Sequence, residues 1–387
     1  MKENINENQI LYSQMMFFDA LNRAPSAKIE EDGSRTIRYF EKEPYVYDHG
    51  DGSVTVRMYA PNAKKVQLAG IGGSLGDTPY DMESDGDGYW RVTIKDLMPG
   101  FHFTNFFVDG QKTVNTNLPL GYGAFQPINY FENIDEKCDF FMLKDVPHGD
   151  VRMQQYKSSI TGRMKACWVY TPPMYDKNID KKYPIVYIQH GVGENEMGWT
   201  WQGKLNVIAD NLLAENKMEE CIIVMNTGYA FVEGEEYDFF PGDFMGELIN
   251  DCIPFIENKY RVKEGKENRA MAGLSLGSTQ AFSIAMHNRD IFKNVGVFSG
   301  GLPYKRPEYD FTDYFADPKN IDKDFDVFFV AGGEHEFNCD NTRALIESFK
   351  EKGSKNAVFY SCPGHHEWGV WRFHLYEFLQ LLFKEVK

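Results

Sequence analysis

Basic residues are in deficit in this chain of 387 residues: 41 Lys and Arg stand against 57 Asp and Glu, a net charge of -16. Nucleic acids and anionic membrane surfaces are bound by basic protein surfaces, so we expect neither as a partner. No run approaches the roughly 20 apolar residues of a membrane span. The N-terminal segment has no apolar core preceded by basic residues, as a secretory signal would have. We therefore expect a soluble cytoplasmic protein.

Cysteine is also scarce and shows no pattern. The six cysteines form no CxxC pair and no metal-ligand spacing, so we expect buried or free thiols in a reducing compartment, and no metal or cofactor. They are Cys138, Cys167, Cys221, Cys252, Cys339 and Cys362.

Aromatic and other apolar residues are plentiful, with 30 Phe, 22 Tyr and 42% hydrophobic residues overall. The length favours two domains, and the sequence changes character near residue 145. We expect an N-terminal leader over 1–44, a β-sandwich of immunoglobulin size over 45–145, and a catalytic domain over 146–387. Short alternating or aromatic runs, the last of them at 138–143, are separated by Gly, Asp, Asn and Pro clusters, which favours the sandwich.

From residue 146 onward, apolar strand-like runs alternate with helical patterns. Examples are YPIVYIQHG, CIIVMNTG and DVFFVAGG for strands, and LNVIADNLLAENKM and MGELINDCIPFIENKY for helices. Continuous apolar strands interleaved with helices predict a parallel sheet covered on both faces.

One serine in this domain lies in a G-x-S-x-G motif, within RAMAGLSLGSTQAF. A predicted strand precedes Ser275 and a predicted helix follows it, with Gly273 and Gly277 on either side. This is the order of an α/β-hydrolase nucleophile elbow, whose close backbones require small neighbours. The N–H of Leu276 would then be an oxyanion donor at the helix N-terminus. The alternative is a small residue in a Gly-rich turn, and the register of strand and helix favours the nucleophile.

A second oxyanion donor is expected after an earlier strand. The segment His190-Gly191-Val192-Gly193 follows the apolar run YPIVYIQ, and its glycines allow the backbone to turn an amide toward the reacting carbonyl. The N–H of Val192 is the candidate. A Gly-rich strand-to-helix turn without this role would have much the same sequence.

The catalytic base should be a histidine after Ser275 in the chain. His287 and His374 lie in predicted helices, which favours packing or surface roles. His365 and His366 lie in SCPGHHEWGVW, a loop between the last strand and the last helix. Spacing alone does not choose between these two.

The acid that orients the base should follow the strand DVFFVAGG. The next segment, EHEFNCD, offers Glu334, Glu336 and Asp340, any of which could instead be a solvated loop carboxylate. A glutamate can do the work of the commoner aspartate, because it too accepts the imidazole N–H.

Residues from about 150 to 387 resemble the feruloyl esterases of carbohydrate esterase family one, in the esterase D group of α/β-hydrolases. The similarity runs through YIQHGVGENEMGW, NRAMAGLSLGSTQAF, VFFVAGGEHEF and GHHEWGVWRF, nearly the whole domain in order. It implies Ser275 as nucleophile, His366 as base and Glu336 as acid. It also implies a hydroxycinnamate such as ferulate as the acyl group and an arabinoxylan oligosaccharide as the alcohol.

Residues 45 to about 125 resemble the early-set sandwich called carbohydrate-binding module family 48, through DGSVTVRMYAPNAKKVQLAG and DGYWRVTIKDLMPGFHFTNFFVDG. Such a module either binds glycan or packs against the catalytic domain. In the catalytic domain Trp199, Trp201 and Trp368 could stack on a phenolic ring or a sugar, or could be buried structural residues.

Other functions stay open at this point. The same group contains esterases of acetylated sugars, siderophores and S-formylglutathione, and a non-catalytic glycan-binding protein is a different class again. Within the leader, the amphipathic stretch ILYSQMMFFDAL predicts a surface that packs on the body of the protein or on a second subunit of a homo-oligomer.

Overall fold

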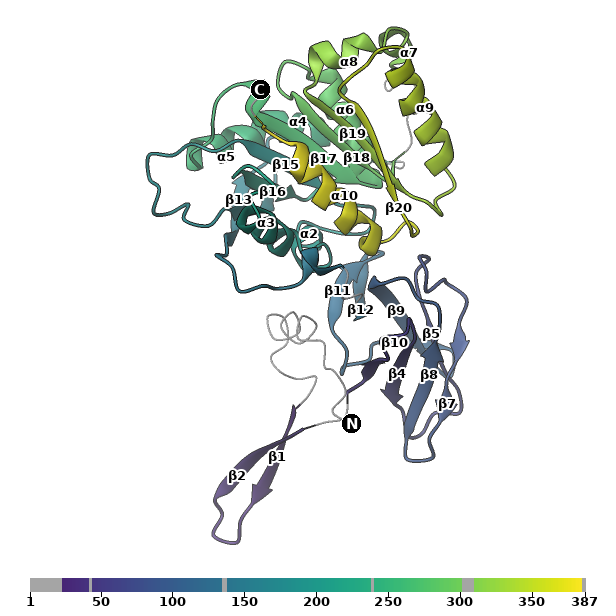
Figure 1. Ribbon diagram of the computed structural model, residues 1–387. Coiled ribbons are helices and arrows are strands. Elements are labelled where there is room, and N and C mark those ends of the chain that lie inside the picture. The colour runs from purple at the N-terminus through teal and green to yellow at the C-terminus, as the bar shows by residue number, and fades with distance from the viewer. Residues whose placement is uncertain (1–22, 42–43, 134–137, 238–239, 301–309, 385–387) are drawn as a thin grey trace. The chain divides into compact units, whose positions relative to one another are not determined.

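The computed structural model describes residues 23–41, 44–133, 138–237, 240–300 and 310–384 (Figure 1). The amphipathic stretch at residues 10–21 lies outside the described residues. In the part described, no helix is both long and apolar enough to cross a membrane. The chain divides into two compact units, one of residues 1–121 and 127–139 and one of residues 122–126 and 140–387.

The first unit contains the predicted β-sandwich. One sheet has the order β3-β4-β8-β7 and the other the order β11-β12-β9-β5-β6, with β10 paired to β9. Both sheets contribute side chains to its buried core, among them Val54, Val56, Phe106 and Phe131. Alternate side chains of a strand point to opposite faces, so one set points into the core. The strands are β3 (Val46–Asp48), β4 (Val54–Tyr59), β5 (Val66–Ala69), β6 (Tyr80–Asp81), β7 (Glu83–Ser84), β8 (Tyr89–Ile94), β9 (Gly100–Val108), β10 (Gln111–Thr113), β11 (Leu120–Gly123) and β12 (Gln126–Asn133).

A separate antiparallel hairpin precedes the sandwich, formed by β1 (Arg23–Ile29) and β2 (Arg35–Glu41).

The pattern of the aromatic run at residues 138–143 predicted a strand, and this prediction was wrong. The run forms a single 3-10 turn, η1 (Asp139–Phe141). The backbone carbonyls of Phe140 and Met142 accept hydrogen bonds from the side-chain amide of Asn211, at 2.9 and 2.8 Å. Because that amide satisfies these carbonyls, the run does not need a sheet partner.

The second unit is built on an eight-stranded sheet of order β13-β14-β16-β15-β17-β18-β19-β20. All pairs from β16 to β20 are parallel, whereas β14 is antiparallel to both β13 and β16. The strands are β13 (Asp150–Lys157), β14 (Met164–Thr171), β15 (Ile185–Gln189), β16 (Ile222–Asn226), β17 (Arg269–Leu274), β18 (Asn294–Phe298), β19 (Val327–Gly333) and β20 (Ala357–Cys362).

The prediction of a parallel sheet was therefore wrong at this edge, where β14 runs antiparallel to both of its neighbours. β13 is half exposed and largely polar, so it has no apolar run to reveal it. Only residues 158–163 join it to β14, and so short a connection can form an antiparallel pair but not a parallel crossover.

Helices cover both faces of this sheet (Figure 1). α3 and α10 pack on each other over one face, while the segment from α4 to α5, together with α6 and α9, covers the other. Strands β15, β16, β18 and β19 are buried along their whole length, and β17 is buried except at its first residue, Arg269, which explains their apolar runs. The helices are α2 (Gly198–Trp201), α3 (Leu205–Ala214), α4 (Phe244–Glu247), the π-helical turn η2 (Leu248–Cys252), α5 (Ile253–Lys259), η3 (Lys266–Asn268), α6 (Leu276–His287), α7 (Thr312–Phe315), α8 (Lys319–Asp324), α9 (Cys339–Glu351) and α10 (Trp368–Leu381).

The loops that leave the carboxyl ends of the parallel strands meet at one edge of the sheet. Gly191 follows β15, Ser275 follows β17, Ser299 follows β18, Glu336 follows β19 and His366 follows β20. Open α/β sheets bind their ligands at this edge.

The turn between β17 and α6 depends on glycine. A Cβ added to Gly277 would lie 2.4 Å from the carbonyl oxygen of His190, and one added to Gly273 would lie 2.3 Å from that of Gly277. Backbone atoms cannot move aside as the end of a flexible side chain can. The helix α6 can therefore approach the end of β15 only without a side chain at Gly277, and the turn from β17 into α6 can close only without one at Gly273.

We predict that Gly277→Ala lowers the free energy of unfolding by about 1–3 kcal/mol, as overpacking does, measured by urea denaturation. Gly332→Ala is the matched control, because its Cβ would meet nothing closer than 3.6 Å. Equal stability of the two variants would contradict the close approach of α6 to β15.

Candidate active site

Ser275 lies on the sharp turn between β17 and α6, with φ 51° and ψ -117°. This conformation is rare for a residue with a side chain and is held by its surroundings. The Ser275 N–H donates to the carbonyl of Phe298 at 2.9 Å, and its carbonyl accepts from the hydroxyl of Ser278 at 2.5 Å. The turn leaves the serine partly exposed at the start of a helix.

His366 reaches Ser275 from the loop between β20 and α10. Its Nε2 lies 2.9 Å from the Ser275 Oγ, and Trp371 packs edge-on against its ring at 5.1 Å. His365 instead packs its ring against His335, with 4.8 Å between centroids. The structure therefore brings His366, and not His365, to the serine.

Glu336 lies on the other side of the histidine. Its Oε2 is 3.4 Å from the His366 Nδ1, a long contact of the kind that tightens when substrate binds. Its Oε1 accepts from the Ser299 hydroxyl at 2.5 Å and from the Gly333 N–H at 3.0 Å. Burial by itself would raise the pKa of Glu336, but the hydrogen bonds from His366 and Ser299 outweigh it and hold the pKa below its usual value.

The two other candidate acids point elsewhere. Glu334 is exposed, and Asp340 pairs with Arg343 at 2.9 Å while its own side chain is 88% exposed. Among the described residues, His366 forms its ion pair with Glu336, and no hydrogen bond or ion pair to it is found from Glu334 or Asp340.

Ser299 is a site residue that sequence reasoning missed. Besides donating to Glu336, its hydroxyl accepts the indole N–H of Trp371 at 2.9 Å, so it connects the acid to the helix that follows His366. Ser299 has a φ of 55° directly after β18. A serine followed by two glycines after an apolar strand was the available signal, in VGVFSGG.

The loop Gly191–Gly193 lies beside the serine. A Cβ added to Gly191 would be 3.4 Å from the Ser275 Cβ, so the backbone of this loop faces the nucleophile. Among the described residues, no hydrogen bond acceptor is found for the N–H of Val192. Leu276 is the first residue of α6, so its N–H has no acceptor inside the helix. The two predicted oxyanion donors are therefore available to a ligand.

Two rings hold this loop. The Nε2 of His190 accepts the Gly228 N–H at 3.1 Å, which leaves its Nδ1–H to donate to the Gly191 carbonyl at 2.8 Å. Burial lowers the pKa of His190 to about 4, so the ring stays neutral near pH 7, as this pair of bonds requires. The Tyr229 hydroxyl accepts the Gly193 N–H at 2.7 Å and donates to the Gly191 carbonyl at 3.4 Å.

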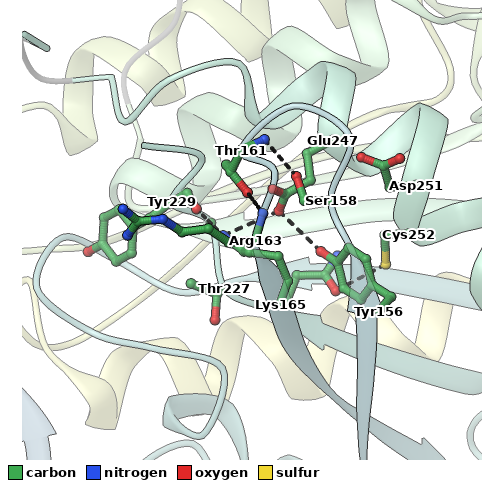
Figure 2. Close-up of polar contacts among 12 residues, drawn as sticks. Tyr156, Ser158, Thr161, Arg163, Lys165, Thr227, Tyr229, Glu247, Asp251 and Cys252 are labelled. Atoms are coloured by element: carbon green, nitrogen blue, oxygen red, sulfur yellow. Dashed lines mark hydrogen bonds and ion pairs between the residues drawn. The ribbon is translucent and has the colours of Figure 1, made fainter. Parts of the chain in front are cut away.

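Tyr229 is itself anchored by a buried ion pair, shown in Figure 2. The ammonium of Lys165 donates to the Tyr229 backbone carbonyl and lies 3.4 Å from the fully buried carboxylate of Glu247. Tyr156 donates its hydroxyl to the same carboxylate at 3.1 Å. Tyr229, which bonds the oxyanion loop, is thus held in turn by polar contacts with Lys165, and Lys165 by Glu247.

The three candidate tryptophans lie in different surroundings. Trp199 and Trp368 are each only 1% exposed and pack edge-on against one another at 5.2 Å. Their indole N–H groups donate to the Gln189 carbonyl at 2.9 Å and to Glu194 at 2.6 Å. Neither ring therefore has a face open to solvent in this structure. Trp201 is half-buried against Trp168.

Comparison with known proteins agrees with this architecture. The model of the Esterase family matches residues 158–382, more than half of the chain, and the chain belongs to that family. The model of carbohydrate-binding module 48 (isoamylase N-terminal domain) matches residues 44–119. The two-part resemblance drawn from the sequence is confirmed.

Two curated proteins with xylanase in their names are similar to this chain. An endo-1,4-beta-xylanase/feruloyl esterase of Xylanibacter ruminicola is 33% identical over 88% of this chain and 46% of its own length. The endo-1,4-beta-xylanase Y of Acetivibrio thermocellus is 27% identical over 63% of this chain and 24% of its own length. The chain thus spans less than half the length of these relatives.

Solved structures share the fold. A ferulic acid esterase of Anaeromyces mucronatus, solved with ferulic acid, is 23% identical with a TM-score of 0.53, and covers 64% of this chain and 95% of its own. The enterobactin esterase of Shigella flexneri is 13% identical with a TM-score of 0.61, and covers 85% of this chain and 92% of its own.

We predict that Glu336→Gln lowers kcat by about 10³- to 10⁴-fold, because an amide cannot hold the histidine tautomer and stabilise the imidazolium. Hydrolysis of a nitrophenyl ester measures this. Glu334→Gln and Asp340→Asn are controls and should keep kcat within about twofold of the unmodified protein, since surface changes away from a site are near neutral. A loss in either control equal to that of Glu336→Gln would show that the acid is misassigned.

Proposed function

We propose that this protein is a serine carboxylic-ester hydrolase that releases hydroxycinnamates of the ferulate type from acylated arabinoxylan oligosaccharides through an acyl-enzyme. The observation that carries the proposal is the 2.9 Å contact between the His366 Nε2 and the Ser275 Oγ, on a turn beside two available backbone donors. Membership of the Esterase family supports the reaction class.

In the first half of the reaction, His366 takes the proton of the Ser275 hydroxyl as the oxygen attacks the ester carbonyl carbon. The backbone N–H groups of Leu276 and Val192 hold the oxyanion of the tetrahedral intermediate, a role typically worth ~3 kcal/mol per donor. Glu336 orients the imidazole and stabilises its protonated form. When the intermediate collapses, the sugar alcohol leaves with the proton from His366.

In the second half, His366 takes a proton from water, and the resulting hydroxide attacks the acyl carbonyl. The same donors hold the second oxyanion. Collapse breaks the bond to Ser275, whose oxygen regains the proton from His366, and the free hydroxycinnamic acid leaves. No step needs a metal or cofactor.

An aromatic surface supports the proposed acyl group. Phe125 and Phe231 are 64% and 46% exposed, and Tyr229 lies between them, stacked on Phe231 at 5.5 Å and tilted against Phe125 at 6.5 Å. The Phe125 N–H also donates to the carbonyl of Gly193 at 2.9 Å, so these rings adjoin the oxyanion loop. Exposed aromatic rings favour a planar phenolic ligand. The feruloyl esterase named among the relatives agrees with this choice.

The substrate test compares methyl ferulate, an acetylated xylo-oligosaccharide and a short-chain nitrophenyl ester. We expect the highest kcat/KM for methyl ferulate, and a loss of about 10⁴-fold or more in kcat for Ser275→Ala on every ester. Unchanged turnover in Ser275→Ala would overturn the nucleophile. Binding of xylan fragments without cleavage of any ester would favour the glycan-binding alternative.

We further predict that Phe125→Ala and Phe231→Ala each lower kcat/KM for methyl ferulate by about 3- to 10-fold, the value of one aromatic contact. The nitrophenyl ester of acetate should be affected by less than about twofold, because its acyl group has no ring to stack. Tyr59→Ala, which removes a 51% exposed aromatic ring from the sandwich, is the control. Equal losses on both esters would contradict an aryl site here.

The cytoplasmic location and the homo-oligomer stay predictions.

A further inference from the structure

Glu194 is a buried carboxyl group that the mechanism does not use. It follows directly after the oxyanion loop and is 6% exposed. Its Oε2 accepts the Gly191 N–H at 3.0 Å, and its Oε1 accepts the Trp368 indole N–H at 2.6 Å. Trp368 begins α10, two residues after His366. One carboxyl group therefore joins the loop that carries an oxyanion donor to the segment that carries the base.

Burial of this group is costly, which argues for a role. Burial raises the pKa of Glu194 to about 7, although both hydrogen bonds oppose the shift. An apolar side chain of similar size would avoid that cost, as replacement of buried charges often does. A carboxylate offers something an apolar side chain cannot, since it accepts two N–H groups from two separate segments at once.

The geometry of one peptide unit shows what these contacts fix. The Gly191 carbonyl and the Val192 N–H belong to the same planar trans peptide, so they point in opposite directions. His190 and Tyr229 bond the carbonyl at 2.8 and 3.4 Å, which aims the Val192 N–H the other way. Glu194 accepts the N–H of Gly191 and so holds the peptide that precedes this glycine. Glycine has wide backbone freedom, so without that bond rotation about Gly191 could reorient the Val192 N–H.

We propose that Glu194 is a positioning residue, which aligns the Val192 donor with the His366 loop through its bonds to Gly191 and Trp368. This inference rests on the proposed ester hydrolysis but not on the identity of the acyl group. Glu194 itself does not contact Ser275 or His366 by any hydrogen bond found among the described residues. Its effect should therefore appear in the transition state, where the oxyanion forms, and not in substrate binding.

Two substitutions separate this role from simple packing. Glu194→Gln keeps the size of the side chain but offers one acceptor in place of two, so one N–H loses its partner. Trp368→Phe keeps a buried aromatic ring and removes the indole N–H, at the cost of a smaller ring, which its control Trp90→Phe shares. Both are made in the full chain, and both are assayed with a short-chain nitrophenyl ester, so that the result does not depend on acyl preference.

Matched controls exist for both. Asp210 is also a carboxyl group with 1% exposure, accepting the Gly149 N–H at 2.9 Å and the Tyr170 hydroxyl at 2.7 Å. Both of these bonds end on the Asp210 Oδ1, and its Oδ2 lies 3.0 Å from the His148 Nδ1, so Asp210→Asn also leaves one of two buried acceptors in place.

Trp90 donates its indole N–H to the Ala60 carbonyl at 3.0 Å in the sandwich. Trp90→Phe removes an indole N–H from a half-buried ring. Both changes lie away from the site.

The readout is the split between kcat and KM, together with affinity for phenylboronic acid. Its boron bonds the serine oxygen and becomes a tetrahedral boronate anion, with one boronate oxygen at the oxyanion position. We expect Glu194→Gln to lower kcat by about 10- to 100-fold, with KM changed by less than about twofold. Affinity for the boronic acid should fall by the same factor as kcat/KM, and affinity for ferulate should not change. Trp368→Phe should lower kcat by about 10-fold, with the same pattern.

The double variant should be no worse than Glu194→Gln by more than about twofold, because the two changes break one chain of contacts. The proposal is overturned if folded Glu194→Gln or Trp368→Phe keeps the kcat and boronic acid affinity of its control, if the loss lies in KM alone, or if the two losses multiply. Should Glu194→Gln fail to fold, Trp368→Phe decides by the same criteria. Absence of ester cleavage in the unmodified protein would instead overturn the proposed function.

Discussion

The contact between the His366 Nε2 and the Ser275 Oγ joins two residues that are 91 positions apart, and the rest of the site is arranged around it. Neither residue could reach the other from a regular element. Ser275 projects from a turn with a rare backbone conformation, and His366 from a loop between strand and helix. A strained backbone conformation of this kind costs on the order of 1–3 kcal/mol and persists only where interactions with the surrounding structure compensate for that cost.

Two kinds of interaction hold Ser275 and the loops around it in place. The glycines beside Ser275 let α6 approach the end of β15, so that the start of the helix and the oxyanion loop adjoin the same hydroxyl. Buried polar side chains then fix the loops themselves, with His190 and Glu194 bonded to Gly191. Such groups cost stability in an apolar interior unless each is hydrogen-bonded. These buried polar groups cluster around the oxyanion loop, where they fix the orientation of its backbone at a cost to the stability of the fold.

Much of this architecture could be predicted from the sequence, because its signals are local. Buried strands are continuous apolar runs, and the turn at Ser275 combines a strand, a helix and two glycines within a few positions. The edge strand β13 was missed because it is polar and half exposed, and residues 138–143 were misassigned because aromatic side chains pack equally well from a helical turn.

Side-chain partners at long range were harder to predict. Spacing could not separate His365 from His366, since adjacent residues in a loop can point in either direction. Only the resemblance preferred Glu336 to its neighbours, and Ser299 gave no signal beyond a small residue after a strand. For Trp199 and Trp368 the sequence left substrate stacking and structural burial both open, because a tryptophan looks the same in sequence whether its indole faces a ligand or, as here, a buried acceptor.

The central claim is that Ser275 is a nucleophile activated by His366. A fluorophosphonate probe tests it directly, because an activated serine oxygen bonds to phosphorus and displaces fluoride. Mass spectrometry of the digested protein should find the added mass on the peptide that contains Ser275, and His366→Ala should slow labelling by about 10³-fold or more. Labelling of a different residue, or an unchanged rate without the imidazole, would contradict the account.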